Sequence, residues 1–301
     1  MTAIAFVGFG EVASRFAEAL QAGGAEVCAY DVLLDGPDGQ RKLRARVRGE
    51  SPSFLPLAQS IGRAEIVLST VTTDVALAAA RQSAPHLRKG QLYVDLNATS
   101  PAMKREIAAV VAQQGADFVE GAILPAVGVM GARSQVLVCG ARAGVVAATL
   151  NSLGLKFDDY GPEIGKASSF KMLRSVFSKG LEALLVESLL AGRRAGVADD
   201  LWREIVATLD AASFEEVGGN WVRTHATAHR RRHQEMVQVA QMLRDMGVDA
   251  PMTEATVALF ERSTRVDLRA AFPSAPASAG DVIAALDERL AAGAPVAGER
   301  R

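Results

Sequence analysis

The beginning of the chain carries a pattern that few folds can accommodate. An apolar run at 3–7 is followed at once by Gly8 and Gly10, and then by helical periodicity over 12–20. A strand, a glycine turn and a helix start in this order leave unpaired backbone N–H groups where an anion can approach. Gly8 permits the tight turn, Gly10 admits the anion, and Ala13 allows the helix to pack closely on the strand. The pattern predicts a pyrophosphate-binding turn.

An acidic residue at the distance expected in a dinucleotide-binding domain indicates which cofactor binds at this turn. The second strand-like run, 25–30, ends at Asp31. A carboxylate there accepts hydrogen bonds from the ribose hydroxyls of a dinucleotide and repels a 2′-phosphate. The nearest basic residues, Arg41 and Lys42, come several positions later, in a loop that can fold back. We therefore predict NAD as the cofactor, with NADP as the alternative.

The cofactor-binding residues follow from this geometry. The glycine turn and the helix start contact the pyrophosphate, Asp31 contacts the adenosine ribose, and residues after two later strands approach the nicotinamide. The predicted cofactor-binding residues are Gly8, Phe9, Gly10, Glu11, Val12, Asp31, Val71, Thr72 and Asn97.

The composition excludes several classes of protein. The chain has 301 residues, of which 49% are hydrophobic, and a formal net charge of −1. This length allows two domains, and this charge provides no general attraction for nucleic acid or an acidic membrane. Cys28 and Cys139 lie in apolar runs without metal-ligand spacing. With no signal-peptide pattern or membrane-length apolar stretch, we predict a cytoplasmic protein without nucleic-acid or membrane partners.

The pattern of elements changes part-way along the chain. Before Gly161, strand-like and helical runs alternate, which predicts βαβ units in a doubly wound parallel sheet of the Rossmann type. The later strand-like runs are 66–71, 92–96, 117–122 and 136–140, and the helical runs between them are 75–83, 102–114 and 143–153. After Gly161 only helical runs follow, at 164–195, 199–212, 221–246, 253–263 and 281–291. We predict a cofactor-binding α/β domain at 1–162 and an all-α domain at 163–301, with a partly flexible tail from about 273.

The long helical run carries a polar stripe at steps of three and four residues. Its members are Ser168, Lys171, Ser175, Ser178 and Glu182. Such a stripe is often a solvated surface, but here serines replace the long charged residues typical of that role. An ammonium group can neutralise the negative charge that builds on a carbonyl oxygen during hydride transfer, by donating a proton. Lys171 is therefore the candidate acid/base, with Lys166 and Arg174 as cations that would lower its pKa.

Three segments together resemble a known family. The glycine turn, the sequence DLNATSP at 95–101 and the sequence GKASSFK at 165–171 are similar to signatures of the β-hydroxyacid dehydrogenases, which include 6-phosphogluconate and 3-hydroxyisobutyrate dehydrogenases. The resemblance is closest to a phosphogluconate-dehydrogenase-like subgroup with its own C-terminal domain. It implies a Rossmann domain, a helical second domain, often a dimer or tetramer, and the lysine at 171 as catalytic acid/base.

Several positions depart from the family pattern, and they concern the substrate. Ser175 replaces an asparagine, and Gln234 and Glu235 replace a lysine–aspartate pair. The hydroxyl- and glycine-rich substrate loop of the family corresponds to 120–128 here, which lacks the serine that binds a carboxylate and contains Leu124 and Pro125. The usual 3-hydroxyacid substrate therefore does not transfer directly. The predicted substrate-binding residues are Leu124, Pro125, Ser175, Trp221 and Glu235.

Another conspicuous cluster lies at 225–233. His225, His229 and His233 share one helical face and flank three arginines. No carboxylate occupies a zincin-like position, so we predict no metal and favour a basic surface or an anion contact.

The sequence thus predicts an NAD(P)-dependent oxidoreductase that moves a hydride between nicotinamide and the hydroxyl or keto carbon of a small hydroxyacid-like substrate. Because the long helix also has an apolar face, a homodimer is expected. Related alternatives are an imine reductase or a dehydrogenase of β-hydroxy amino acids or phosphonates. Alternatives of other classes are a non-catalytic NAD-binding module and a metal-dependent enzyme that uses the three histidines.

Overall fold

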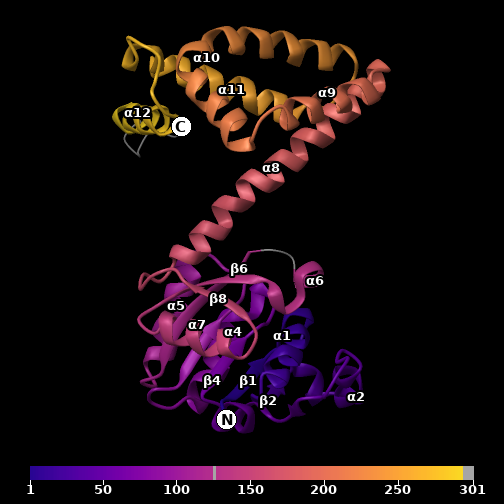
Figure 1. The fold of residues 1–301 in the computed structure, drawn as a ribbon, viewed down its shortest axis with the longest axis vertical. Coiled ribbons are helices and arrows are strands. Elements are labelled where there is room, and N and C mark those ends of the chain that lie inside the picture. The colour runs from indigo at the N-terminus through magenta and orange to yellow at the C-terminus, as the bar shows by residue number, and fades with distance from the viewer. Residues whose placement is uncertain (125–126, 294–301) are drawn as a thin grey trace, which may run out of the picture. The chain divides into compact units, whose positions relative to one another are not determined.

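The computed structural model describes residues 1–124 and 127–293, which form two compact units. The first unit is Met1–Val176, and the second begins at Phe177. Helix α8 (Lys166–Ala195) begins in the first unit and continues in the second (Figure 1). The first unit therefore includes the start of α8 and, with it, Lys171.

The first unit is built on one eight-stranded sheet in the order β3-β2-β1-β4-β5-β6-β7-β8. The strands are β1 (Ala3–Val7), β2 (Glu26–Tyr30), β3 (Ser53–Phe54), β4 (Ile66–Ser69), β5 (Leu92–Asp95), β6 (Asp117–Ile123), β7 (Gln135–Cys139) and β8 (Lys156–Asp159). All neighbours pair in parallel except β6 and β7. The predicted doubly wound fold class is confirmed.

Helices cover both faces of this sheet. They are α1 (Glu11–Ala22), α2 (Gly39–Arg44), α3 (Leu57–Arg63), α4 (Ala76–Ser83), α5 (Pro101–Ala112), α6 (Val127–Met130) and α7 (Ala143–Ser152). Short 3₁₀ turns join them at Val32–Asp35, Thr73–Val75, Ala84–His86 and Gly131–Arg133.

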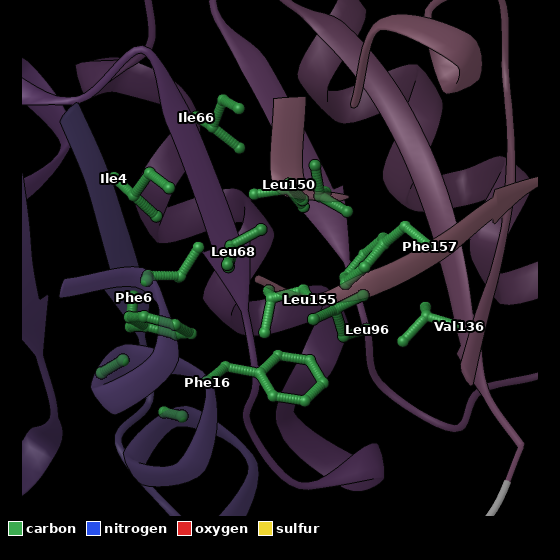
Figure 2. Close-up of a cluster of buried hydrophobic side chains, with 14 of the residues drawn as sticks. Ile4, Phe6, Phe16, Ile66, Leu68, Leu96, Val136, Leu150, Leu155 and Phe157 are labelled. Atoms are coloured by element: carbon green, nitrogen blue, oxygen red, sulfur yellow. The ribbon is translucent and has the colours of Figure 1, made fainter. Parts of the chain in front are cut away.

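The sheet has two cores because successive side chains of a strand point to opposite faces. On β1, Ile4 and Phe6 pack in the core beneath α1 and α7, whereas Ala5 and Val7 pack beneath α3, α4 and α5. In the first core, Phe16 of α1 meets Phe157 of β8 edge to face, with ring centroids 6.1 Å apart (Figure 2). These cores hold the carboxyl ends of the parallel strands in place.

The structure differs from the sequence expectation at the edges of the sheet. Strands β3 and β8 were not predicted, since β3 has only two residues and β8 is a polar edge strand. The pair β6–β7 is antiparallel, although an all-parallel sheet was expected. In the described part of the connection between them there are only α6 and a 3₁₀ turn, and a parallel crossover needs a longer covering element.

The second unit is helical. After α8 come α9 (Ala198–Asp210), α10 (Phe214–Asp245), α11 (Pro251–Arg265), a 3₁₀ turn at Leu268–Ala271 and α12 (Ala279–Ala292). In the expected tail, a capping box at Ser278 and Asp281 starts α12, whose Val282 is buried against Ala226 and Leu268. Among the described residues, we find no helix with the length and apolarity to span a membrane.

Candidate active site

A cavity of about 620 Å³ lies at the carboxyl ends of β1, β2 and β4. It is lined by residues that directly follow these strands, among them Gly8, Asp31 and Val71. Every residue predicted to contact the cofactor lines this cavity, except Asn97. In an open α/β sheet, this edge is where ligands bind.

The glycine turn has the geometry that an anion requires. Gly8 has φ +84°, and a Cβ there would lie 2.7 Å from Val71 Cγ1 and 2.9 Å from the Thr70 carbonyl oxygen. A Cβ on Gly10 would meet no atom within 4 Å, so it would enter open space. No side chain caps the N-terminus of α1. The first N–H groups of α1 are therefore available to a phosphate group, and the residues present fit a dinucleotide.

Asp31 is held rigidly at the wall of this cavity. Its two carboxylate oxygens accept hydrogen bonds from Phe9 N at 2.8 Å and Leu33 N at 3.0 Å. The Phe9 ring is buried and packs edge to face on Phe54, so Phe9 borders the cavity with its backbone. The acid predicted to contact the ribose is thus fixed by the glycine turn itself.

The basic residue in the lining of this cavity is Arg46, which sequence reasoning missed. Arg46 lines the cavity and donates from Nη1 to the Phe9 carbonyl oxygen at 2.6 Å. Arg41 and Lys42, the expected candidates, do not line it, and Arg41 pairs with Asp38 at 3.0 Å. Nothing in the spacing distinguishes Arg46 from its neighbouring arginines; only the folded course of the chain after α2 brings it back.

A second cavity, of about 260 Å³, contains Lys171. It is formed by the loop after β5, by β6 and by the start of α8, with Lys171 as its one charged lining residue among those described. The lining residues are Asn97, Ala98, Thr99, Gly121, Ala122, Ser168, Lys171, Met172 and Ser175. Ser168, Lys171 and Ser175 show that part of the predicted polar stripe faces this cavity.

A buried carboxylate positions the first turn of α8. Glu120 of β6 is fully buried and accepts hydrogen bonds from Gly165 N at 2.5 Å and Ser168 N at 3.0 Å. A negative charge at a helix N-terminus is favourable because it compensates the unpaired N–H groups there. Glu120 was predicted only as part of a substrate loop. An acidic residue within an apolar strand was the signal for this structural role.

Lys171 is partly buried, and its amine is perturbed. Burial lowers the pKa of Lys171, and the nearby positive charge of Lys104 lowers it further. The two cations expected to lower the pKa of Lys171 have other partners. The Lys166 ammonium lies 4.7 Å from the centre of the Tyr160 ring, and Arg174 donates to the Leu124 carbonyl oxygen at 3.1 Å. The cation that acts on Lys171 is thus Lys104, which the sequence analysis did not identify. A lowered pKa suits an amine that must both accept and donate a proton.

Asn97 lines the Lys171 cavity and not the larger one, although it was predicted to contact the cofactor. Its backbone N–H binds Asp95 Oδ1 at 2.8 Å, and its Nδ2 donates to Ser69 Oγ at 3.0 Å. Its Oδ1 is buried without a hydrogen-bond partner, as is Thr99 Oγ1. Both residues line the Lys171 cavity, and these two oxygens are buried in its wall.

The two cavities belong to one edge of the sheet. Ser69 ends β4, whose following residues line the larger cavity, and it binds Asn97 in the smaller one. Thr73 Oγ1, next to Thr72 of the larger cavity, approaches the Ala98 carbonyl oxygen at 3.5 Å. A ligand along the carboxyl ends of β2, β1, β4 and β5 can therefore extend from Asp31 toward Lys171.

Comparison with known proteins identifies this arrangement. Residues 3–153 match the model of the NAD binding domain of 6-phosphogluconate dehydrogenase, half of the chain. The chain belongs to this family. Residues 193–263 match a domain of unknown function, DUF1932. The predicted resemblance and the predicted NAD-binding Rossmann domain are both confirmed.

Solved structures agree with this assignment. A conserved hypothetical protein from Sinorhizobium meliloti 1021 is 33% identical, with 96% of this chain and 97% of that chain covered and a TM-score of 0.62. The conserved protein MTH1747, described as structurally similar to 3-hydroxyacid dehydrogenases, is 31% identical, with 88% and 99% covered and a TM-score of 0.59.

The fold also occurs in imine reductases. The enzyme from Myxococcus stipitatus, a variant in complex with NAD⁺, has a TM-score of 0.76 at 17% identity, with 96% of this chain and 99% of that chain covered. At this identity the likeness concerns the fold alone. The dehydrogenases and reductases that share this fold are oxidoreductases.

The residues predicted to bind the substrate lie in different parts of the molecule. Ser175 lines the Lys171 cavity, and its hydroxyl donates to the Lys171 carbonyl oxygen at 3.0 Å. Leu124 packs with the small core around Ala122, and Pro125 lies outside the described residues. Trp221 and Glu235 lie on α10 in the second unit, both exposed.

The histidines on α10 are engaged with their own unit. His225 Nε2 contacts Ser263 Oγ at 2.9 Å, and His229 Nδ1 contacts the His225 carbonyl oxygen at 2.9 Å. Burial is the main cause that lowers the pKa of His225 to about 4. In residues 1–124 and 127–293, no three or more His, Cys, Asp or Glu side chains are grouped so that they can hold a metal ion.

Proposed function

We propose that the protein is an NAD-dependent dehydrogenase that transfers a hydride between nicotinamide and the hydroxyl or keto carbon of a small hydroxyacid-like substrate, with Lys171 as general acid/base. The observation that carries this proposal is the partly buried amine of Lys171 in a cavity shared with Asn97. Asn97 is tied through Ser69 to the strand that borders the dinucleotide cavity.

In this proposal, some residues bind the cofactor and Lys171 transfers the proton. The backbone of Gly8, Gly10 and the first turn of α1 would hold the pyrophosphate, and Asp31 the adenosine ribose. The nicotinamide, when bound, supplies or accepts the hydride. In oxidation, the neutral Lys171 amine removes the hydroxyl proton; in reduction, the ammonium returns it to the carbonyl oxygen.

The volume and the lining of the smaller cavity indicate what kind of substrate fits it. Its volume of about 260 Å³ is less than half the 620 Å³ of the larger cavity. Ala98, Ala122 and Met172 give it an apolar part, and Ser168 adds a hydroxyl. These features favour a short substrate with one polar reacting end. Leu124, Pro125, Ser175, Trp221 and Glu235 remain proposed substrate contacts.

The test starts with cofactor binding, measured by calorimetry with NAD and NADP. Short hydroxy- and keto-acids, β-hydroxy amino acids and phosphonates, and cyclic imines are then screened by the absorbance of reduced nicotinamide. Turnover of a hydroxy- or keto-acid that is lost in Lys171→Met supports the proposal. NAD binding without turnover of any compound favours the non-catalytic module, and turnover of imines alone favours the reductase.

A chelator control separates the metal-dependent alternative. Turnover that survives dialysis against a chelator agrees with proton transfer by Lys171. Loss of turnover, restored by a divalent metal, would contradict the proposal and direct attention to His225, His229 and His233.

We also propose that NAD is preferred over NADP, and that the protein is cytoplasmic. The first follows from the fixed Asp31 carboxylate, which repels a 2′-phosphate. The second fits the two free, buried thiols of Cys28 and Cys139.

We further propose that the protein forms a homodimer. The apolar face of α8 is exposed in the single chain: Leu173 is 69% and Val176 is 72% exposed. Apolar side chains in such a row favour self-association. We expect light scattering to give twice the mass of the chain, and Leu173→Glu with Val176→Glu to reduce it to the monomer; a wild-type monomer would refute the dimer.

A further inference from the structure

Lys104 is a lysine without any access to solvent. It lies on α5, the helix that Ser100 caps by accepting a hydrogen bond from Met103 N. Its ammonium forms an ion pair with Asp95 Oδ1 at 2.9 Å, and neither side chain is exposed. A fully buried ammonium is rare because water no longer solvates its charge.

The remaining contacts of this ammonium are backbone carbonyls. Lys104 Nζ donates to the carbonyl oxygens of Asp95 at 2.9 Å and Asn97 at 2.8 Å, and it approaches that of Gly121 at 3.4 Å. Asn97 and Gly121 belong to different segments, and both line the Lys171 cavity. One amine thus joins the end of β5, the loop after it and β6 directly behind the cavity wall.

The charges near this wall can be named. Besides Lys104 on α5, they are Asp95 on β5 and Glu120 on β6, which binds the first turn of α8. On α8 itself, Lys166 and Arg174 are engaged with Tyr160 and Leu124. Of all these groups, Lys104 is the one whose charge adds to burial in lowering the pKa of Lys171.

We propose that Lys104 is a positioning residue for the reaction at Lys171: it fixes the backbone of Asn97 and Gly121 and holds a permanent positive charge behind the same cavity wall. The inference rests on the proposed role of Lys171 as acid/base. A purely structural ion pair needs no contact with the cavity lining, whereas two acceptors of Lys104 belong to that lining.

The test compares two charge changes of opposite sign. Lys104→Met removes a positive charge and Asp95→Asn removes a negative one, while three carbonyl oxygens still surround the ammonium in Asp95→Asn. The readout is competitive labelling of the Lys171 amine with acetic anhydride across pH, quantified by peptide mass spectrometry. It needs no substrate, so it is independent of whether the proposed reaction is correct.

The expected shifts are opposite. Labelling of Lys171 in Lys104→Met should need a pH higher by about half a unit or more, because the positive charge of Lys104 no longer opposes protonation of Lys171. In Asp95→Asn it should need a lower pH. The matched control is Lys156→Met, an exposed lysine on β8, which should leave the Lys171 profile unchanged.

Every result decides the proposal. A structural role alone would lower the melting temperature of both variants without opposite shifts, and unchanged profiles in folded variants would overturn the inference. If Lys104→Met does not fold, Asp95→Asn carries the test, and the absence of a downward shift refutes it. If the shifts occur but Lys171→Met retains turnover, then the proposed function fails while the electrostatic coupling stands.

Discussion

The two cavities at the carboxyl edge of the sheet are built on different principles. The larger one offers backbone groups to a ligand at a glycine turn and an uncapped helix start, beside a carboxylate held by two N–H groups. The smaller one is formed by side chains from the loop after β5, from β6 and from α8. A backbone cavity recognises a ligand through main-chain groups that many sequences provide, whereas a side-chain cavity changes with each residue. The family assignment therefore says more about the cofactor than about the substrate.

The largest expected effect separates chemistry from cofactor binding. Lys171→Met should lower kcat by about 10²- to 10⁴-fold because the proposed acid/base group is lost, while the calorimetric Kd for NAD changes little. Lys179→Met, an exposed lysine of the same helix, is the control. Equal losses of turnover and of NAD binding would show that the two cavities do not act separately.

Two glycine substitutions test the backbone cavity. Gly10→Ala places a methyl group in open space and costs less than about 1 kcal/mol of stability, but it should weaken NAD binding about tenfold because the phosphates need that space. Gly8→Ala is its strained counterpart, since φ is +84° and Val71 is in the way; it should destabilise the fold by about 1–2 kcal/mol. Calorimetry and thermal melting measure both. Unaltered NAD affinity in Gly10→Ala would remove the glycine turn from the cofactor site.

A smaller effect concerns the choice between NAD and NADP. Asp31→Asn should reduce the preference for NAD about fivefold, because the repulsion of a 2′-phosphate disappears. Arg46→Ala should weaken NADP binding more than NAD binding, and Arg44→Ala, an exposed neighbour, should change neither. Both Kd values are measured for each variant. A stronger NAD preference in Asp31→Asn would contradict the proposed ribose contact.

The smallest effect is on stability. Since the folded-state pKa of Lys171 lies below its unfolded value, protonation costs stability below the folded pKa, and this cost disappears as pH rises through the unfolded value near 10.4. Lys171→Met should therefore be more stable than the wild type at neutral pH, by less than about 1 kcal/mol. The difference should vanish in alkaline solution. Urea denaturation at several pH values measures it, and a loss of stability at neutral pH would argue against a perturbed amine.

The sequence predicts the backbone cavity well because its elements are consecutive. Gly8, Gly10 and the helix after them are local features, and Asp31 comes at the end of the next strand. Lys171 is also identifiable, through helical spacing and the family resemblance. Lys104 is not, because a lysine on an amphipathic helix is normally solvated, and its acceptors come from two separate segments, 95–97 and β6. Arg46 is hidden for a similar reason, since no local rule brings the chain after α2 back to Phe9.

The carboxylate of Glu120 has a consequence for how this protein can diversify. By accepting hydrogen bonds from Gly165 and Ser168, it holds the start of α8 against strand β6. Later turns of α8 can then accept new side chains, and with them new substrates or assemblies, while the Lys171 amine stays in its cavity. Substitutions at the start of α8 would therefore disturb this attachment, whereas substitutions further along the helix would leave it intact.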